Sequence, residues 1–195
     1  MSTNILLARH GKTLANLENR FAGRSNEPLH RDGEEQLAEV AASLKEQTLT
    51  AIYAGPLPRT AQSAEIVSQA TGAPVQYREA FTEIDLPHWD GLTKDEITSR
   101  FGQEYPTWLS APQDFQVAGC ETLAQAQKRA VAETERLFID HKDEAVLVIS
   151  HLIVVRCLIL HYRQQPISKF RSIKIDNASL TLLSRNSDGQ TSVSL

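Results

Sequence analysis

Two short, mainly apolar segments, NILLA at residues 4–8 and AVLVIS at residues 145–150, constrain the fold of this chain most strongly. Segments of this kind are typical of strands that are buried on both faces of a parallel sheet. Each segment leads within two residues to a histidine, His10 in the first case and His151 in the second. Because parallel strands share one carboxyl edge, where open α/β folds bind ligands, the sequence predicts that the two histidines meet there.

Strand and helix patterns alternate along the rest of the chain. Strands are predicted at residues 51–54, 75–77 and 178–184, and helices at residues 32–47, 59–71 and 122–140. Asp32 is the expected N-cap of the first of these helices, and Gly72 ends the second. Such alternation predicts an α/β fold, a three-layer α/β/α sandwich whose mostly parallel sheet has helices on both faces. Residues 9–31 are expected to form a loop, and residues 104–115 a loop or a lid.

The composition fits one folded domain over residues 1–195. A chain of 195 residues, 41% of them hydrophobic, can bury one substantial core, and no linker or repeat divides it. The formal net charge of −4 provides no general basic field, so no nucleic-acid partner is expected. Cys120 and Cys157 lack the spacing of a disulfide framework or a metal site. The apolar N-terminal stretch is too short for a signal peptide or a membrane span, so we expect a cytoplasmic protein with no membrane partner.

Arginines accompany the two histidines. Arg9 precedes His10, and Arg59 opens the helix that follows the strand at residues 51–54, which places it at the same expected edge. Guanidinium groups bind phosphate through paired hydrogen bonds, and helix N-termini add N–H donors, so converging arginines describe an oxyanion site. A metal ion beside two fixed positive charges is disfavoured, so no metal is expected. The remaining histidines have no comparable setting and are interpreted as structural. They are His30, His88, His141 and His161.

Several short motifs follow one another in a distinctive order. They are RHGKT with Asn16, NRFAG, EPL followed by Gly33, PLPRTAQSA, TEIDLPHWDG, GCETL with Arg129, and VLVISH followed by Arg156. In this order they resemble the histidine phosphatase superfamily, the phosphoglycerate-mutase-like proteins. The resemblance runs from about residue 5 to residue 184, which is nearly the whole chain, and it implies the phosphoglycerate-mutase-like fold.

The resemblance also implies a mechanism. His10 would be the nucleophile that takes the phosphoryl group, and a hydrogen bond to one ring nitrogen would determine which nitrogen faces phosphorus. Arg9, Arg59 and His151 would surround the phosphoryl oxygens, which is the positioning and charge stabilisation that phosphoryl transfer needs. Asn16 would lie beside them. No cofactor is implied.

Two glycines have expected places in this site. Gly23, in the NRFAG motif, is expected to help bind the phosphate, and Gly11 is expected to let the backbone turn close to it.

An acid is needed to protonate the leaving oxygen. The motif FTEIDLPHWDG offers three carboxylates, and the residues alone do not choose among Glu83, Asp85 and Asp90. The family resemblance puts the role on Glu83.

Departures from the family pattern bear on the substrate. Lys12 stands where the family usually has Glu or Gln, Leu152 follows His151 where a glycine is frequent, and Pro87 replaces a glycine. The loop at residues 12–31 is locally basic, with Lys12, Arg20, Arg24 and Arg31, and is expected to attract a substrate with a second anionic group. Four aromatic residues are expected to form either a lid over this basic loop or part of the core. They are Phe101, Tyr105, Trp108 and Phe115.

Three hypotheses about function follow. The first is a metal-independent phosphatase that hydrolyses a small phosphorylated metabolite through a phosphohistidine. The second is a cofactor-dependent phosphoglycerate mutase, but the region after the acid offers mainly Lys94 and Arg100 in place of the paired arginines and lysine of such mutases. The third is a non-catalytic module that binds phosphorylated ligands. The final segment TSVSL is expected to be an edge strand available for pairing in a homodimer.

Overall fold

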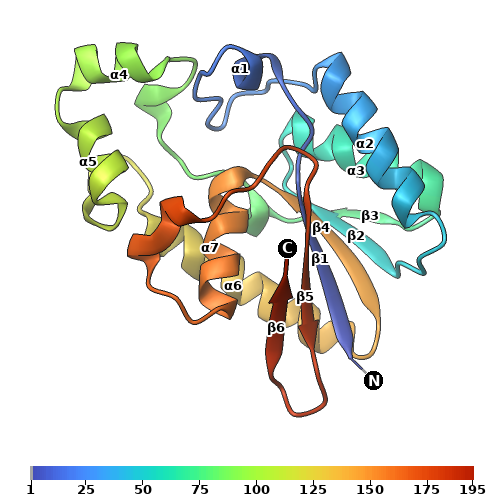
Figure 1. Ribbon diagram of the computed structural model, residues 1–195. Helices are drawn as coiled ribbons and strands as arrows, with labels where there is room; N and C mark the ends of the chain where they lie inside the picture. Colours follow the sequence, from blue (N-terminus) through green and yellow to red (C-terminus); the bar gives the residue numbers. More distant parts are fainter. Residues whose placement is uncertain (1) are drawn as a thin grey trace.

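The computed structural model describes residues 2–195 and is built around a six-stranded sheet with the strand order β3-β2-β4-β1-β5-β6 (Figure 1). The strands are β1 (Thr3–Arg9), β2 (Ala51–Ala54), β3 (Val75–Tyr77), β4 (Ala145–Ser150), β5 (Leu180–Arg185) and β6 (Thr191–Ser194). The first four pair in parallel, whereas β5 runs antiparallel to β1 and β6 antiparallel to β5. The sheet is therefore mixed at one edge.

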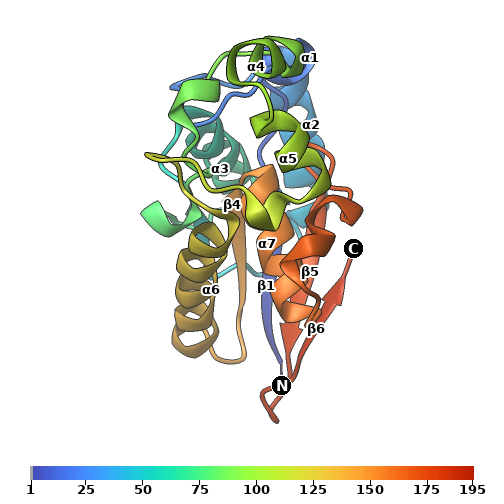
Figure 2. The ribbon, with the colours of Figure 1, turned by 90° about the vertical axis from the view of Figure 1, so that its left-hand side faces the viewer.

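Helices cover both faces of the sheet, as the alternating pattern predicts (Figures 1 and 2). One face carries α2 (Arg31–Leu44) and α3 (Pro58–Thr71), and the other carries α6 (Leu123–Asp140) and α7 (Leu152–Tyr162). Successive side chains of a strand point to opposite faces, so Ile5 and Leu7 of β1 belong to the core under α6 and α7, whereas Ala8 belongs to the core under α2 and α3. The expected three-layer sandwich is confirmed.

The register between β1 and β4 brings the two histidines together. Arg9 pairs with Ser150 at the carboxyl ends of these strands, and the backbone N–H of His10 donates to the Ser150 carbonyl at 3.0 Å. His10 and His151, the next residues along the two strands, therefore emerge at one edge of the sheet.

The predicted strands and long helices are present with ends within three residues of those expected. Gly72 ends α3 in the left-handed conformation. The N-cap assigned to Asp32 is wrong, because α2 begins at Arg31 and is capped by the His30 side chain, which accepts from the Asp32 N–H at 3.2 Å. Asp32 lies instead in the first turn, where its negative charge is favourable.

Two segments expected to be loops contain helices. Residues 9–31 include the one-turn helix α1 (Leu14–Leu17), and residues 104–115 contain α5 (Glu104–Ser110) followed by a turn of 3₁₀ helix. Pro106 is tolerated because it lies in the first turn of α5, where a missing N–H costs little. Two further helices, α4 (Lys94–Phe101) and α7, were not predicted at all.

The aromatic residues of α5 and its surroundings belong to the core. Trp89, Tyr105, Trp108 and Phe115 are all buried, with ring centroids 5.1 Å apart for Trp89 and Phe115 and 5.3 Å for Trp108 and Phe115. The Phe101 and His88 rings pack edge to face, with centroids 4.7 Å apart. These side chains are absent from the lining of the cavity described below, so the lid interpretation is wrong and the core alternative is correct.

Candidate active site

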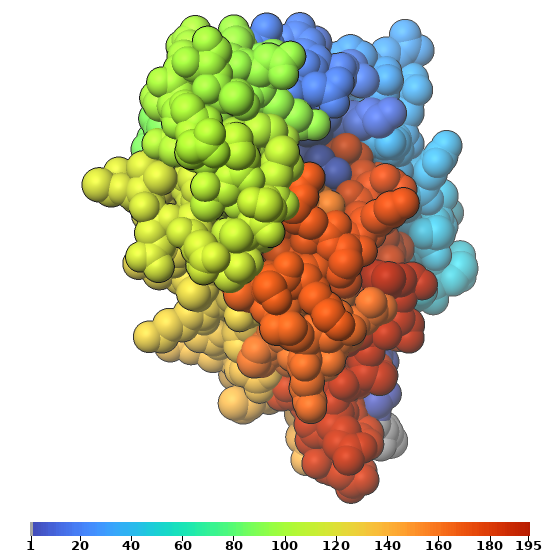
Figure 3. Space-filling view, turned by 60° about the vertical axis from the view of Figure 1, so that its left-hand side comes forward, coloured from blue at the N-terminus to red at the C-terminus, as the bar shows by residue number. Residues whose placement is uncertain are grey.

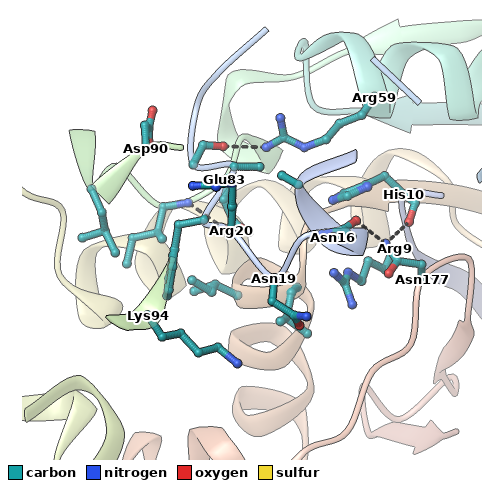
Figure 4. Close-up of a pocket in the computed structure, with 18 residues that line it drawn as sticks. Arg9, His10, Asn16, Asn19, Arg20, Arg59, Glu83, Asp90, Lys94 and Asn177 are labelled. Carbon is teal, nitrogen blue, oxygen red and sulfur yellow. Dashed lines mark hydrogen bonds between the residues drawn. The ribbon is translucent and has the colours of Figure 1, made fainter. Parts of the chain in front are cut away.

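A cavity opens at the carboxyl edge of the parallel strands. Figure 3 shows the hollow where the green α4 segment, the dark-blue segment around α1 and the orange segment around and after α7 meet. Eighteen residues line the cavity, and ten of them are labelled in Figure 4. Its lining includes six of the predicted site residues: Arg9, His10, Asn16, Gly23, Arg59 and Glu83.

The two histidines lie against each other beneath this cavity. The ring centroids of His10 and His151 are 5.2 Å apart with the rings tilted by 59°. Nδ1 of His10 lies 2.7 Å from the Gly11 carbonyl oxygen, which can only accept a hydrogen bond, so Nδ1 carries the proton and Nε2 keeps its lone pair. Neither ring nitrogen of His151 has a partner among residues 2–195. His151 is fully buried and contacts His10 without being among the residues that line the cavity.

Burial keeps both imidazoles neutral. Burial, assisted by the charges of Arg59 and Arg9, lowers the pKa of His10 well below its ordinary value. The pKa of His151 is lowered in the same way, first by burial and then by Arg59. A neutral imidazole with a free Nε2 can act as a nucleophile near pH 7.

Two guanidinium groups face this edge, that of Arg59 buried and that of Arg9 half-buried. Arg59, in the first turn of α3, donates to the carbonyls of Ser25 at 3.0 Å and Gly23 at 2.5 Å, and Arg9 donates to the Ile175 carbonyl at 3.1 Å. The Nε of each has no protein partner, and neither forms an ion pair with a carboxylate within residues 2–195. Burial lowers the pKa of Arg9 to about 10, which leaves it charged at pH 7. The two groups can therefore bind an oxyanion.

The structure separates the three candidate acids. Asp85 does not line the cavity and lies 3.5 Å from an Arg24 guanidinium nitrogen. Glu83 and Asp90 both line it, and burial raises the pKa of each. Arg9 and Arg59 are both among the charges that act most on Glu83, whereas the main charges on Asp90 are Asp85, Arg59 and Arg24. A raised pKa suits a carboxyl group that must donate a proton, and Glu83 is the better placed.

The two glycines have different surroundings. Gly23 adopts a φ of 49° beside Asp90, whose carboxylate occupies the space that a side chain would need. Gly11 does not line the cavity. A Cβ at Gly11 would lie 2.5 Å from the Gly33 carbonyl oxygen, so its lack of a side chain serves the close approach of the segment after β1 to α2.

The basic rim expected from residues 12–31 is only partly present. Arg20 lines the cavity, but Lys12, Arg24 and Arg31 do not. Arg20 is neutralised by Glu18 at 2.9 Å and by Glu96 at 3.0 Å.

A second cation, Lys94, comes from α4. It lines the cavity and forms no ion pair within residues 2–195 (Figure 4). Leu152 also lines the cavity, so that departure from the family pattern narrows the site, whereas Pro87 begins a 3₁₀ turn outside the lining.

The other histidines have structural partners, which agrees with their interpretation. His88 contacts Glu104 at 2.5 Å and His141 contacts Tyr53 at 2.8 Å. His30 caps α2, and His161 packs edge-on against Tyr162. Within residues 2–195 no group of three His, Cys, Asp or Glu side chains is arranged to hold a metal ion. Nor does any helix of that range combine the length and apolar character needed to cross a membrane.

Sequence reasoning missed Asn177, which also lines the cavity. It directly precedes the predicted strand 178–184, and nothing local in the sequence marks it. Because β5 runs antiparallel to β1, its first residues lie at the same edge as the last residues of β1. Recognising that direction from the sequence would have pointed to Asn177.

Comparisons with known proteins agree with this arrangement. The family model described as "Histidine phosphatase superfamily (branch 1)" matches residues 5–195. The chain is 27% identical over 179 residues to phosphoserine phosphatase 1 of Hydrogenobacter thermophilus, covering 92% of this chain and 85% of that protein. It is 29% identical over 182 residues to the probable phosphoglycerate mutase GpmB of Shigella boydii, covering 91% and 82%. The solved structure of YhfR from Bacillus stearothermophilus is similar with a TM-score of 0.93 and 28% identity, covering 98% of this chain and 95% of that one.

Proposed function

The chain belongs to branch 1 of the histidine phosphatase superfamily and is a phosphatase of small phosphorylated molecules, and we propose that it works by transferring the phosphoryl group to His10 and then to water. The observation that carries this proposal is the state of His10. Its Nδ1 is committed to the Gly11 carbonyl, which leaves Nε2 as a neutral nucleophile beside the guanidinium groups of Arg9 and Arg59.

In the first half-reaction, Nε2 of His10 attacks phosphorus and the bond from phosphorus to the ester oxygen breaks. Arg9, Arg59 and His151 stabilise the charge on the phosphoryl oxygens, and Asn16 and the Gly23 segment border the same space. The protonated carboxyl group of Glu83 donates its proton to the departing oxygen. Its raised pKa supports this role.

In the second half-reaction, water attacks phosphorus and the bond between phosphorus and Nε2 breaks. The Glu83 carboxylate, left ionised by the first step, takes the proton from that water. The enzyme therefore returns to its starting state with inorganic phosphate as the product.

We propose further that the preferred substrate carries a second anionic group. Lys94 supports this proposal because its charge borders the cavity without an ion-pair partner within residues 2–195, whereas Arg20 is already neutralised by Glu18 and Glu96. A free cation at a cavity wall attracts a carboxylate or a second phosphate. The two arginines at the far end of the site would hold the scissile phosphate.

The remaining expectations are proposals as well. We propose a cytoplasmic location, and the free thiols of Cys120 and Cys157 support it because a reducing cytoplasm keeps thiols free. The acidic net charge supports a small metabolite and not a nucleic acid as the partner. β6 lies at the edge of the sheet, where a second copy of the chain can pair in a homodimer.

The test is hydrolysis of a panel of phosphate monoesters by purified protein, with a chelator present throughout. We expect hydrolysis that does not depend on divalent metal. The value of kcat/KM should be higher for phosphoserine or 3-phosphoglycerate than for an alkyl phosphate that has no anionic group besides its phosphate. Lys94→Met should remove most of that preference, while Lys45→Met, at the end of α2, should keep it. Isomerisation of phosphoglycerates in place of hydrolysis would favour the mutase alternative, and binding without turnover would favour the non-catalytic alternative.

A further inference from the structure

Asn177 connects the proposed nucleophile to the wall of the cavity. It lies in the segment before β5, and its side-chain nitrogen Nδ2 donates to the backbone carbonyl of His10 at 3.1 Å and to Oδ1 of Asn16 at 3.0 Å (Figure 4). One amide group thus ties together residues at the end of β1 and in α1.

Backbone partners determine how both amides are oriented. The Thr13 N–H can only donate, and it lies 3.2 Å from Oδ1 of Asn16, so this atom is the oxygen. The His10 carbonyl can only accept, so the Asn177 atom that contacts it is the nitrogen. Asn16 therefore has its oxygen occupied by two donors, and its own NH₂ group, which has no acceptor among residues 2–195, is left for the cavity.

The backbone next to Asn177 holds its side chain in place. Ala178 has a φ of 59°, a conformation that residues with a side chain rarely adopt. Its N–H donates to the carbonyls of Arg9 at 3.0 Å and His10 at 3.3 Å. Together with the Asn177 side chain, these bonds fasten the segment to the end of β1, at the residues that supply the guanidinium and the imidazole.

We propose that Asn177 is a positioning residue of the phosphatase, which acts by turning the NH₂ group of Asn16 toward the phosphoryl group. Without Asn177, Oδ1 of Asn16 keeps only the Thr13 N–H as a donor, so the amide is held less firmly against the rotation that would turn its oxygen, which repels an anion, toward the phosphoryl group. The Asn16 NH₂ group contacts phosphoryl oxygens that every substrate shares, so Asn177 affects all phosphate monoesters alike. The inference rests on the proposed function, because it assumes that phosphate binds beside His10.

The experiment is a double-mutant cycle of Asn177→Ala and Asn16→Ala, read by the affinity for inorganic phosphate and by kcat/KM with several monoesters. We expect Asn177→Ala to weaken phosphate binding and lower kcat/KM by about tenfold, the size of one hydrogen bond, with the same factor for every monoester. In the Asn16→Ala background the same change should have little effect, because the group that Asn177 positions is gone.

A second variant and a control keep the cycle decisive. Asn177→Asp has nearly the same shape but cannot donate to either partner, so it should show at least the same loss. Asn186→Ala, which removes an amide from the β5–β6 turn, should leave phosphate affinity and kcat/KM unchanged. The midpoints of thermal unfolding show which variants keep the fold. If Asn177→Ala does not fold, Asn177→Asp takes its place in the cycle.

The outcomes separate this inference from the proposed function. Independent, multiplicative losses at Asn177 and Asn16 would mean that Asn177 only supports the local structure, and an Asn177→Asp variant with wild-type phosphate affinity would overturn the proposal directly. Wild-type protein that neither binds phosphate nor hydrolyses monoesters would contradict the proposed function itself.

Discussion

His10 and His151 lie with their ring centroids 5.2 Å apart, although the strands that they follow are far apart in the sequence. The parallel register of β1 and β4, with Arg9 beside Ser150, is the reason. Because both rings are buried next to two guanidinium groups, neither takes a proton easily. The two imidazoles are therefore neutral in a site whose arginines carry positive charge.

We predict that His10 is phosphorylated during turnover. Rapid quenching with a labelled phosphate monoester should trap an adduct that is stable to base and labile to acid, as expected of a phosphohistidine. His10→Ala should form no adduct and lose about 10³-fold or more in kcat, because the nucleophile is gone. Cys120→Ala is the control and should label normally, and a label found on another residue would disprove this mechanism.

A change from Arg59 to Lys should be severe even though the charge is kept. Lysine cannot donate to both the Ser25 and Gly23 carbonyls and still offer a planar pair of donors to phosphate. We expect kcat to fall by about 10²-fold, as when a preorganised donor to an oxyanion is removed. Arg31→Lys, at an exposed ion pair with Glu35, should leave kcat unchanged. Near-normal activity in Arg59→Lys would show that only the charge matters.

Glu83→Gln tests the general acid through the leaving group. An alkoxide needs a proton to depart, so the variant should phosphorylate His10 from an alkyl phosphate roughly 10² to 10⁴-fold more slowly. With p-nitrophenyl phosphate the first step should stay fast and be followed by slow release of phosphate, seen as a burst of nitrophenol. Equal slowing of the first step for both substrates would leave Glu83 a positioning role. If Asp90→Asn gave the leaving-group dependence, the acid would have to be reassigned to Asp90.

The depressed pKa values of His10 and His151 predict that acid destabilises the fold. Below pH 6.5, the ordinary pKa of about 6.5 lets the histidines of the unfolded chain bind protons, while His10 and His151 in the native protein stay neutral. The free energy of unfolding therefore falls as the pH drops below about 6.5 and is restored above it. Each histidine contributes at most about 1.4 kcal/mol per pH unit.

Urea unfolding at pH 5 and pH 7 measures this effect against a variant with both histidines replaced by alanine. That variant should show the smaller change in the free energy of unfolding between the two values. Glu83, whose pKa is raised, acts in the opposite sense in both proteins, so the comparison isolates the histidines. An identical pH dependence in wild type and variant would contradict the assignment.

Much of the fold and part of the site could be predicted because the signals are local. The apolar segment before Arg9 and the one before His151 predict buried strands, and parallel strands necessarily share a carboxyl edge. Helical spacing of apolar residues predicted α2, α3 and α6 for the same reason. Residue types and motif order were then sufficient to propose His10, Arg9, Arg59 and His151 as one phosphate site.

Other features depend on contacts between distant segments, which no local pattern records. The residues alone left Glu83, Asp85 and Asp90 open, and the family resemblance chose Glu83 without a physical reason. The reason, a carboxyl group buried near both arginines, is visible only in the structure, as is the filling of the space beside Gly11 by Gly33 of α2. The antiparallel direction of β5, which brings Asn177 to His10, is likewise set by strand pairing. By itself the sequence determined the strands, the helices α2, α3 and α6, and the residue types of the proposed site. Only the tertiary structure decided which polar groups face one another, because burial and hydrogen bonding between remote residues exist only once the chain is packed.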